Sequence, residues 1–260
     1  MRLVDLSVPI EHAAPFEVFP PEIEYRPHDG FGLELFKSQF GVSEDDLVYS
    51  GGLGAGEERL TLVAHAGTHV DAPWHYGPLS EGEPAATIDE LPLEWFWSDG
   101  VVLDVRHKRS GEEITIADLE AALAAIDYEL RPLDIVMLWT GSGERLYDGD
   151  YFEQPGMGRE STLWLVERGI RVIGIDAFTF DRPFAAMAED FRRTGDGRVI
   201  WPAHFAGITR SYCQIEKLAN LGAIGRSHGF KVAAFPVKVA RGSAGWARVV
   251  AFVEEQPAVG

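Results

Sequence analysis

The fold class is decided by VVLDVRHKRSGEEITIADLEAALAAIDYELRPLDIVMLW, residues 101–139. Its two ends, 101–105 and 134–139, are short apolar runs typical of buried strands. Between them, Thr115 can cap a helix whose apolar residues recur every three or four positions. These residues are Ile116, Leu119, Ala122, Leu123 and Ile126. A strand, a helix and a second strand in this order predict an α/β fold.

The regular pattern continues on both sides of this stretch. Downstream, Ser161 can cap a helical segment that ends at Gly169, and a third buried strand follows at 172–176. Further apolar runs predict strands at 1–10, 59–64, 232–239 and 246–253. No linker or internal repeat interrupts the chain. We therefore expect a mixed sheet with more strand than helix, in a single domain over residues 1–260.

Residues 12–56 lack this regularity and predict a loop-rich section. They contain several prolines and the glycine run GGLGAG at 51–56. Long irregular segments inside a domain are more often functional or partner-contacting than idle. The segment also holds Phe16, Phe19, Phe31, Phe36 and Phe40. These rings can either wall a pocket or serve ordinary packing.

The composition argues against several classes of partner. The 41 acidic and 23 basic residues give a formal net charge of −18, which repels phosphate backbones and anionic lipid. Nucleic acid is therefore not expected as a partner. No apolar stretch reaches about 18 residues, so the chain is not expected to cross a membrane either. Cys213 is the only cysteine, and the N-terminal residues do not resemble a signal peptide. Both features favour a cytoplasmic protein.

The chemistry of the chain centres on HAGTHVDAPWH, residues 65–75, which holds three of the eight histidines. Imidazole nitrogens and carboxylate oxygens are ligands of Zn²⁺, Mn²⁺ and Fe²⁺. On an extended segment His69 and Asp71 point the same way, and a turn at Gly67 can bring His65 beside them. Three ligands from one segment leave coordination positions open for water and substrate. This pattern predicts a catalytic metal site.

Two neighbours of these ligands are further candidates. His75 titrates near neutral pH and can donate or accept a proton. Trp74 can form one wall of a pocket for a flat, apolar substrate. The alternatives are a hydrogen-bonded loop histidine and an ordinary packing residue. Asp176, at the end of a predicted strand, is either a functional carboxylate at the sheet edge or a hydrogen-bonded turn residue.

The 65–75 motif resembles the signature H-x-G-[TA]-H-x-D-x-P-x-H of the cyclase superfamily, which includes bacterial kynurenine formamidase and isatin hydrolase. Residues 174–183 (GIDAFTFDRP), the segments within 201–221 and the opening DLSVPIE are similar as well. The resemblance implies a swivelling β/β/α-like fold with a barrel-like sheet and flanking helices. It implies that His65, His69 and Asp71 bind a metal and that His75 is the catalytic acid/base.

The same resemblance implies a second set of ligands. In the formamidases a second cation is held by the same aspartate, a later histidine and a glutamate twelve residues beyond. His204 and Glu216 have this spacing and are predicted as metal ligands and catalytic residues. Isatin hydrolase-like members have glutamine in place of the glutamate and one manganese, so one or two ions, manganese or zinc, are expected here. From the residues alone, His204 would be a core or turn residue and Glu216 would open a surface helix.

These features predict a metal-dependent hydrolase that cleaves an amide, lactam or related cyclic acyl C–N bond. The metal lowers the pKa of bound water from 15.7 towards about 7, and His75 moves the proton. The substrate is expected to be a small molecule with an aromatic part. The alternatives are a lactonase or dehydrating cyclase using the same site, and a non-catalytic metal-binding subunit. The resemblance also implies a homodimer or homotetramer.

Overall fold

The computed structural model describes residues 1–254 and divides the chain into two compact units. Unit 1 comprises Met1–Pro9 and the chain from Ala64 onward, and unit 2 comprises Ile10–Val63. Every residue predicted for the metal site belongs to unit 1. Within residues 1–254, no helix is both long and apolar enough to cross a bilayer.

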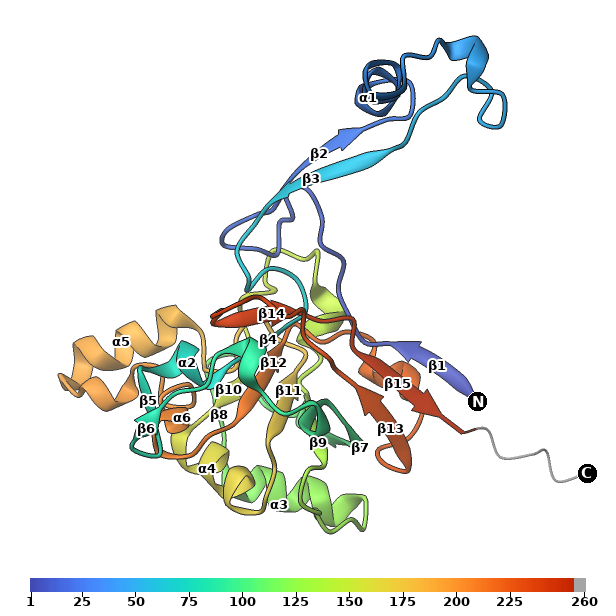
Figure 1. The fold of residues 1–260 in the computed structure, drawn as a ribbon. Coiled ribbons are helices and arrows are strands. Elements are labelled where there is room, and N and C mark those ends of the chain that lie inside the picture. Colours follow the sequence, from blue (N-terminus) through green and yellow to red (C-terminus); the bar gives the residue numbers. More distant parts are fainter. Residues whose placement is uncertain (255–260) are drawn as a thin grey trace, which may run out of the picture. The chain divides into compact units, whose positions relative to one another are not determined.

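Unit 1 is built on one curled sheet with the strand order β1-β15-β13-β7-β9-β11-β12-β4-β14 (Figure 1). The strands are β1 (Arg2–Asp5), β4 (His69–Asp71), β7 (Trp97–Asp104), β9 (Ile135–Trp139), β11 (Val172–Ile175), β12 (Cys213–Glu216), β13 (Phe230–Ala233), β14 (Ala244–Trp246) and β15 (Val250–Val253). Strands β7, β9, β11 and β12 run parallel, and the other neighbours are antiparallel. The predicted mixed, barrel-like sheet with flanking helices is confirmed.

Helices connect the parallel strands. Helix α3 (Ile116–Ala125) joins β7 to β9, and α4 (Arg159–Glu167) joins β9 to β11, because parallel neighbours require a crossover. The other helices are α2 (Pro73–Tyr76), α5 (Phe184–Thr194) and α6 (Ala206–Thr209). Short 3₁₀ turns lie at η2 (Ile88–Glu90), η3 (Leu93–Phe96), η4 (Ser142–Arg145), η5 (Gly197–Val199) and η6 (Leu221–Ile224). The small strand pairs are β5 (Leu79–Ser80) with β6 (Glu83–Pro84), and β8 (Glu113–Ile114) with β10 (Gly156–Met157).

Alternate side chains of the central strands enter two apolar clusters. Val101 and Leu103 of β7 belong to one cluster, with Leu119 of α3 and Leu165 of α4. Val102 belongs to the other, together with residues of β1, β4, β12, β13 and β15. Burial on both faces explains why these strands are continuous apolar runs rather than alternating ones.

The predicted start of α3 is confirmed, whereas that of α4 is wrong. Thr115 Oγ1 accepts a hydrogen bond from Asp118 N at 3.3 Å, and the Asp118 carboxylate accepts one from Thr115 N at 2.8 Å. Helix α4 begins earlier than expected, because Gly158 takes its N-cap position. Ser161 lies in the first turn, where its hydroxyl accepts a hydrogen bond from Gly158 N at 3.2 Å.

The strand expected over 246–253 is split in two by the curl of the sheet. Strand β14 pairs with β4 at one end of the strand order, whereas β15 pairs with β1 and β13 near the other. Between them, Ala247 N donates to Thr68 O at 3.0 Å, and Val249 N donates to Ser7 Oγ at 2.7 Å. Such a short link can join the two ends because the curl brings them close together.

Unit 2 contains regular structure that the sequence pattern does not reveal. Strand β2 (Glu22–Arg26) pairs antiparallel with β3 (Glu57–Thr61), and α1 (Phe31–Phe40) and η1 (Glu44–Asp46) lie between them in the chain. The strand expected at 59–64 therefore belongs to this pair. Most of residues 12–56 lies in turns and loops as expected, but the prediction missed β2, α1 and η1. Helix α1 was not predicted because Gly30, its N-cap residue, supplies no capping side chain.

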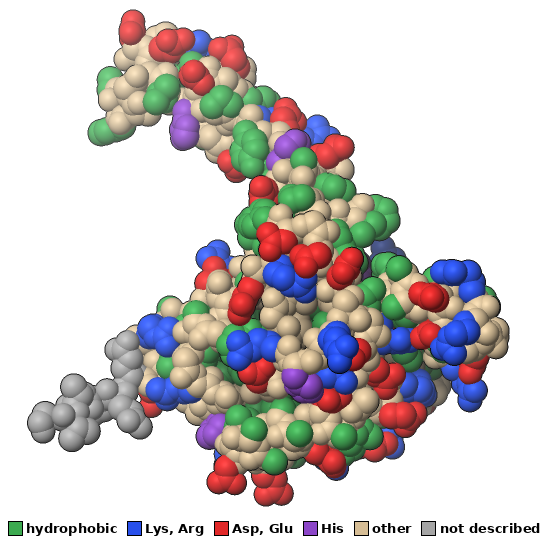
Figure 2. All heavy atoms as spheres, turned by 180° about the vertical axis from the view of Figure 1, so that it is seen from behind, with side chains coloured by type: hydrophobic (Ala, Val, Ile, Leu, Met, Phe, Trp, Pro, Cys, Tyr) green, Lys and Arg blue, Asp and Glu red, His purple; other side chains and the backbone are tan. Residues whose placement is uncertain are grey.

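Charged side chains of both signs are mixed over the surface. On the face shown in Figure 2, Lys and Arg lie among Asp and Glu over unit 1. Ion pairs join several opposite charges of unit 1, for example Arg106 with Asp104 and Arg248 with Asp5, each at 2.6 Å. The acidic excess is therefore not gathered into a single patch on this face.

Candidate metal centre

The register of two short strands brings the predicted ligands together. In the antiparallel pair β4–β12, Asp71 lies opposite Gln214 and His69 lies opposite Glu216. Side chains of such cross-strand pairs share one face of the sheet, with Cβ atoms about 4.5–5.5 Å apart. Val70, between the two ligands, points to the opposite face and into the core. Four polar side chains therefore converge on one face of the sheet.

The turn before β4 adds His65 to this group. Gly67 adopts a left-handed conformation with φ of 60°, which is easily reached only by glycine. His65 Nδ1 then lies 2.8 Å from Asp71 Oδ1, and His69 Nε2 lies 3.3 Å from the same oxygen. His69 Nδ1 contacts the carbonyl oxygen of Gly67 at 2.9 Å. With its proton on Nδ1, His69 presents Nε2 as a free ligand atom.

Two buried atoms at this point have no hydrogen-bond partner in the described part of the chain: His69 Nε2 and Asp71 Oδ1. Both side chains are fully buried. Burying unpaired polar atoms is costly, and a shared cation removes that cost. Burial opposes ionisation of Asp71, but the nearby histidines outweigh it and hold the pKa of this carboxyl well below its usual range. One ligand atom each of His69, Asp71 and Glu216 lies within 4.8 Å of the others, and imidazoles and carboxylates have the chemistry of ligands for a divalent cation.

His75 stands beside these ligands on α2. The centroid of its ring lies 4.2 Å from that of His65 and 5.6 Å from that of His204. Burial is the main cause that lowers the pKa of His75 to about 4; Asp71 opposes the shift, and the neighbouring histidines add to it. At neutral pH the imidazole is therefore uncharged and can accept a proton. One ligand atom each from His65, Asp71 and His75 lies within 4.8 Å of the others.

The structure also brings His204 and Glu216 into this group. Asp181 accepts a hydrogen bond from His204 Nδ1 at 2.5 Å and leaves Nε2 facing Asp71 Oδ2 at 3.9 Å. Glu216 Oε1 accepts from Phe180 N at 2.8 Å and lies 3.6 Å from His204 Nε2. Glu216 is buried in β12, so the alternative of a surface-helix residue is wrong.

The sequence analysis missed Gln214 and Trp201, and it gave Asp181, which lies in the family-like segment 174–183, no role in the site. The Trp201 indole stacks on His204, with ring centroids 4.3 Å apart and planes 9° apart, and lies 5.6 Å from the His75 ring. Its backbone has φ of 49°, a costly conformation for a bulky residue. Trp74 is 48% exposed at the start of α2, and its role remains a prediction. A lone Gln or Trp carries no sequence signal that would have marked these positions.

Of the two alternatives for Asp176, a functional carboxylate or a hydrogen-bonded turn residue, the structure favours the turn residue. Its carboxylate accepts hydrogen bonds from Thr140 N at 2.7 Å, Thr140 Oγ1 at 2.6 Å and Gly141 N at 2.9 Å. Burial raises the pKa of Asp176 to about 6, although these hydrogen bonds oppose the shift. The residue therefore holds the turn that follows β9.

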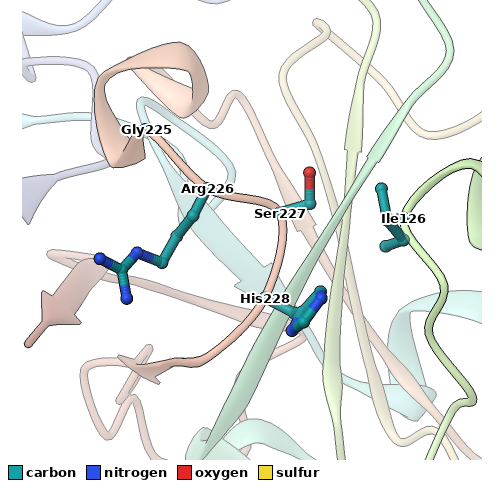
Figure 3. A pocket seen from close by; sticks show the side chains of 5 residues that line it. All are labelled: Ile126, Gly225, Arg226, Ser227 and His228. Carbon is teal, nitrogen blue, oxygen red and sulfur yellow. The ribbon is translucent and has the colours of Figure 1, made fainter.

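A separate hollow of about 520 Å³ lies away from these residues. It is lined by Ile126, Gly225, Arg226, Ser227 and His228. Figure 3 shows the Arg226 guanidinium extending away from the His228 ring. That ring instead lies against Tyr128, with centroids 4.8 Å apart. No carboxylate belongs to the five lining residues, so this hollow does not resemble a metal site.

Comparisons with known proteins identify relatives of the chain. Kynurenine formamidase of Bordetella petrii is 29% identical over 192 residues, which cover 69% of this chain and 71% of that protein. Kynurenine formamidase of Erythrobacter litoralis is 31% identical over 123 residues, and the match spans only 50% of its length and 47% of this chain. The matches to the formamidases of Bacillus mycoides and Bacillus cereus likewise span about half of those proteins, 52% each.

Solved structures share the fold over nearly the whole chain. A crystal structure of an isatin hydrolase bound to thioisatinate superposes with a TM-score of 0.72 at 21% identity, covering 98% of this chain and 93% of that one. Isatin hydrolase A from Ralstonia solanacearum gives 0.74 at 22% identity, covering 97% and 92%. The family model described as "Putative cyclase" matches residues 4–182, which include the whole 65–75 motif. The chain therefore belongs to the cyclase family.

Proposed function

We propose that this protein is a metal-dependent hydrolase that cleaves an amide, lactam or related cyclic acyl C–N bond of a small molecule. The observation that carries the proposal is the pair of buried atoms His69 Nε2 and Asp71 Oδ1, which make no hydrogen bond and lie next to the imidazoles of His65 and His75. The names of the relatives, a formamidase and a hydrolase of the lactam isatin, support this choice of bond.

His65, His69 and Asp71 would hold the cation. When bound, a divalent cation supplies a water of lowered pKa and polarises a carbonyl oxygen. His75 accepts a proton at its imidazole and returns it to the leaving nitrogen, which requires the uncharged form that burial favours. Glu216, whose Oε2 lies 3.6 Å from His69 Nε2, would orient the nucleophile, and His204 would support it from the far side of Asp71. Asp181 holds His204 with its proton on Nδ1.

The surroundings of His75 support a substrate with a flat apolar part. Trp201 borders both the metal centre and a hollow of about 480 Å³. The residues that line this hollow are Phe184, Met187, Ala188, Phe191, Arg192, Ile200 and Trp201. An aromatic ring placed there would bury apolar surface and stack on the indole. Trp201 is therefore a second candidate, in addition to Trp74, for a side chain that contacts the aromatic part of the substrate.

We expect the metal-loaded protein to hydrolyse N-formylaniline and isatin faster than aliphatic formamides of similar size. Trp201→Ala should raise KM for N-formylaniline by about tenfold, because an aromatic pair contributes about 0.5–1.5 kcal/mol beyond area burial. KM for N-methylformamide should not change. Formate release and the change in isatin absorbance measure both reactions.

Trp97→Ala is the matched control, because Trp97 is a partly exposed tryptophan of β7 whose ring contacts Phe252, outside the metal centre. Turnover of lactones alone would favour the lactonase alternative. Absence of turnover with every acyl substrate, at saturating Mn²⁺ or Zn²⁺, would favour a non-catalytic metal-binding subunit. Either result would contradict the proposed C–N hydrolase.

Finer properties belong to the same proposal. Two imidazole nitrogens and one carboxylate oxygen suit manganese and zinc, and we propose one of these as the ion. We also propose that the protein is cytoplasmic and that residues 1–260 form one functional domain. We also propose a homodimer or homotetramer in which unit 2 contacts a second copy. Exposed apolar side chains in unit 2 support this: Val18, Phe19, Tyr25, Phe31, Leu35, Phe40, Val48, Tyr49, Leu53, Leu60 and Val63. A monomer by light scattering at micromolar concentration would contradict it.

A further inference from the structure

We propose that the centre binds one divalent cation and that the side-chain amide of Gln214 occupies the position where a second cation would otherwise bind. This inference rests on the proposed function, because it concerns the same metal centre. The sequence analysis left one or two ions open, because Glu216 could bind a second ion. The inference chooses one ion.

A second set of donor atoms exists on the far side of Asp71. Asp71 turns Oδ1 towards His65 and His69 and leaves Oδ2 on the side of His204. His204 Nε2 lies 3.9 Å from Asp71 Oδ2 and 3.6 Å from Glu216 Oε1. All three are atoms of the kind that bind divalent cations, and His204 Nε2 lies within 4 Å of each of the two carboxylate oxygens.

The Gln214 amide nitrogen lies among these same three atoms. Nε2 of Gln214 is 2.6 Å from His204 Nε2, 3.0 Å from Asp71 Oδ2 and 3.4 Å from Glu216 Oε1. The two N–H groups of the amide can donate to His204 and Asp71, because both present acceptors there. A cation would need bonds of about 2.0–2.2 Å to the same donors, so the amide and the ion cannot share the position.

The orientation of the amide is set by its surroundings. The hydroxyl of Tyr212 lies 3.0 Å from Gln214 Oε1 and 2.9 Å from the carbonyl oxygen of Ala203. A flipped amide would place its oxygen against the Asp71 and Glu216 carboxylates, where only a donor is favourable. Tyr212 is fully buried and stacks on Tyr76, with ring centroids 5.1 Å apart. Gln214 is itself fully buried within the sheet, so water cannot replace the hydrogen bonds that its amide makes there.

The two sets of donors thus differ in one respect that matters for an ion. In the first set, His69 Nε2 and Asp71 Oδ1 are buried without a partner. In the second set, each metal-binding atom already lies within 3.4 Å of the Gln214 amide nitrogen. The energetic reason to take up a cation exists at the first position and is removed at the second.

The test is the number of ions bound per chain. Protein stripped with a chelator is titrated with MnCl₂ or ZnCl₂ by calorimetry, and the bound metal is measured by elemental analysis after gel filtration. We expect one equivalent for the wild-type chain and two for Gln214→Ala, which opens the second position. In the Mn²⁺-loaded variant, the electron paramagnetic resonance spectrum should show coupling between two ions, whereas the wild-type spectrum should show a single uncoupled ion.

Cys213→Ala is the matched control and should bind one equivalent, because Cys213 precedes Gln214 in β12 but points into the core on the opposite face. Two equivalents in the wild-type chain would overturn the inference and leave the proposed function intact. No bound cation in the wild-type chain would overturn the proposed function itself. One equivalent in both the wild-type chain and Gln214→Ala would show that Gln214 does not exclude the ion.

Discussion

His75→Ala should lower kcat for the hydrolysed amide by about 10²–10⁴-fold while the bound metal stays unchanged. The ring of His75 lies beside the proposed ligands, and its lowered pKa keeps it uncharged and ready to accept a proton. Its removal takes away the group that moves the proton to the leaving nitrogen, but none of His65, His69 or Asp71. Turnover and metal content must be measured on the same preparation.

His228→Ala provides the control for this prediction, because His228 lines the separate hollow and contacts Tyr128. Its activity and metal content should equal those of the wild-type chain. If His75→Ala retained full activity, His75 would not be the acid/base. If it lost the metal instead, His75 would be a ligand.

Asp71→Asn should abolish turnover and weaken metal binding by at least about 100-fold, more than the 10–100-fold typical of residues that only support a ligand. Asp71 Oδ1 is the atom that both His65 Nδ1 and His69 Nε2 approach, so the neutral amide removes the one negative charge that the first set of donors shares. Competition with a coloured chelator measures the affinity.

A second readout is independent of catalysis. A ligand at 100 times its Kd stabilises a folded protein by about 2.7 kcal/mol, so Mn²⁺ or Zn²⁺ should raise the thermal midpoint of the wild-type chain and not that of Asp71→Asn. Asp176→Asn is the matched control, because Asp176 is a buried aspartate that holds a turn outside the metal centre. It should be less stable but keep its full response to metal. An equal response to metal in Asp71→Asn would exclude Asp71 as a ligand.

The sequence predicted the central part of the fold well because that part is local. Residues 101–139 contain a strand, a capped helix and a strand, and each element carries its own pattern. The prediction failed where distant segments decide the outcome. The run 246–253 has the pattern of one strand. Its middle residues instead donate hydrogen bonds to Thr68, which precedes β4, and to Ser7, which follows β1, and the run is therefore divided into two strands.

The candidate site divides in the same way. His65, His69, Asp71 and His75 could be predicted as a group because they lie close together in the sequence, on one turn, the short strand β4 and the helix α2. His204 and Glu216 were expected only from the family resemblance, since the strand pairing that places Glu216 opposite His69 involves residues far apart in the chain. Gln214, Asp181 and Trp201 have no distinguishing spacing at all.

Reading the chain alone was enough to determine the α/β class and to predict the first set of metal ligands and the candidate base, because periodicity and alternation act over a few residues. The closure of the sheet, the second set of donors and the presence of Gln214 among them depend on the register of β12 against β4. Register is set by how whole strands bury their apolar faces, and such burial is a property of the packed molecule rather than of any short segment.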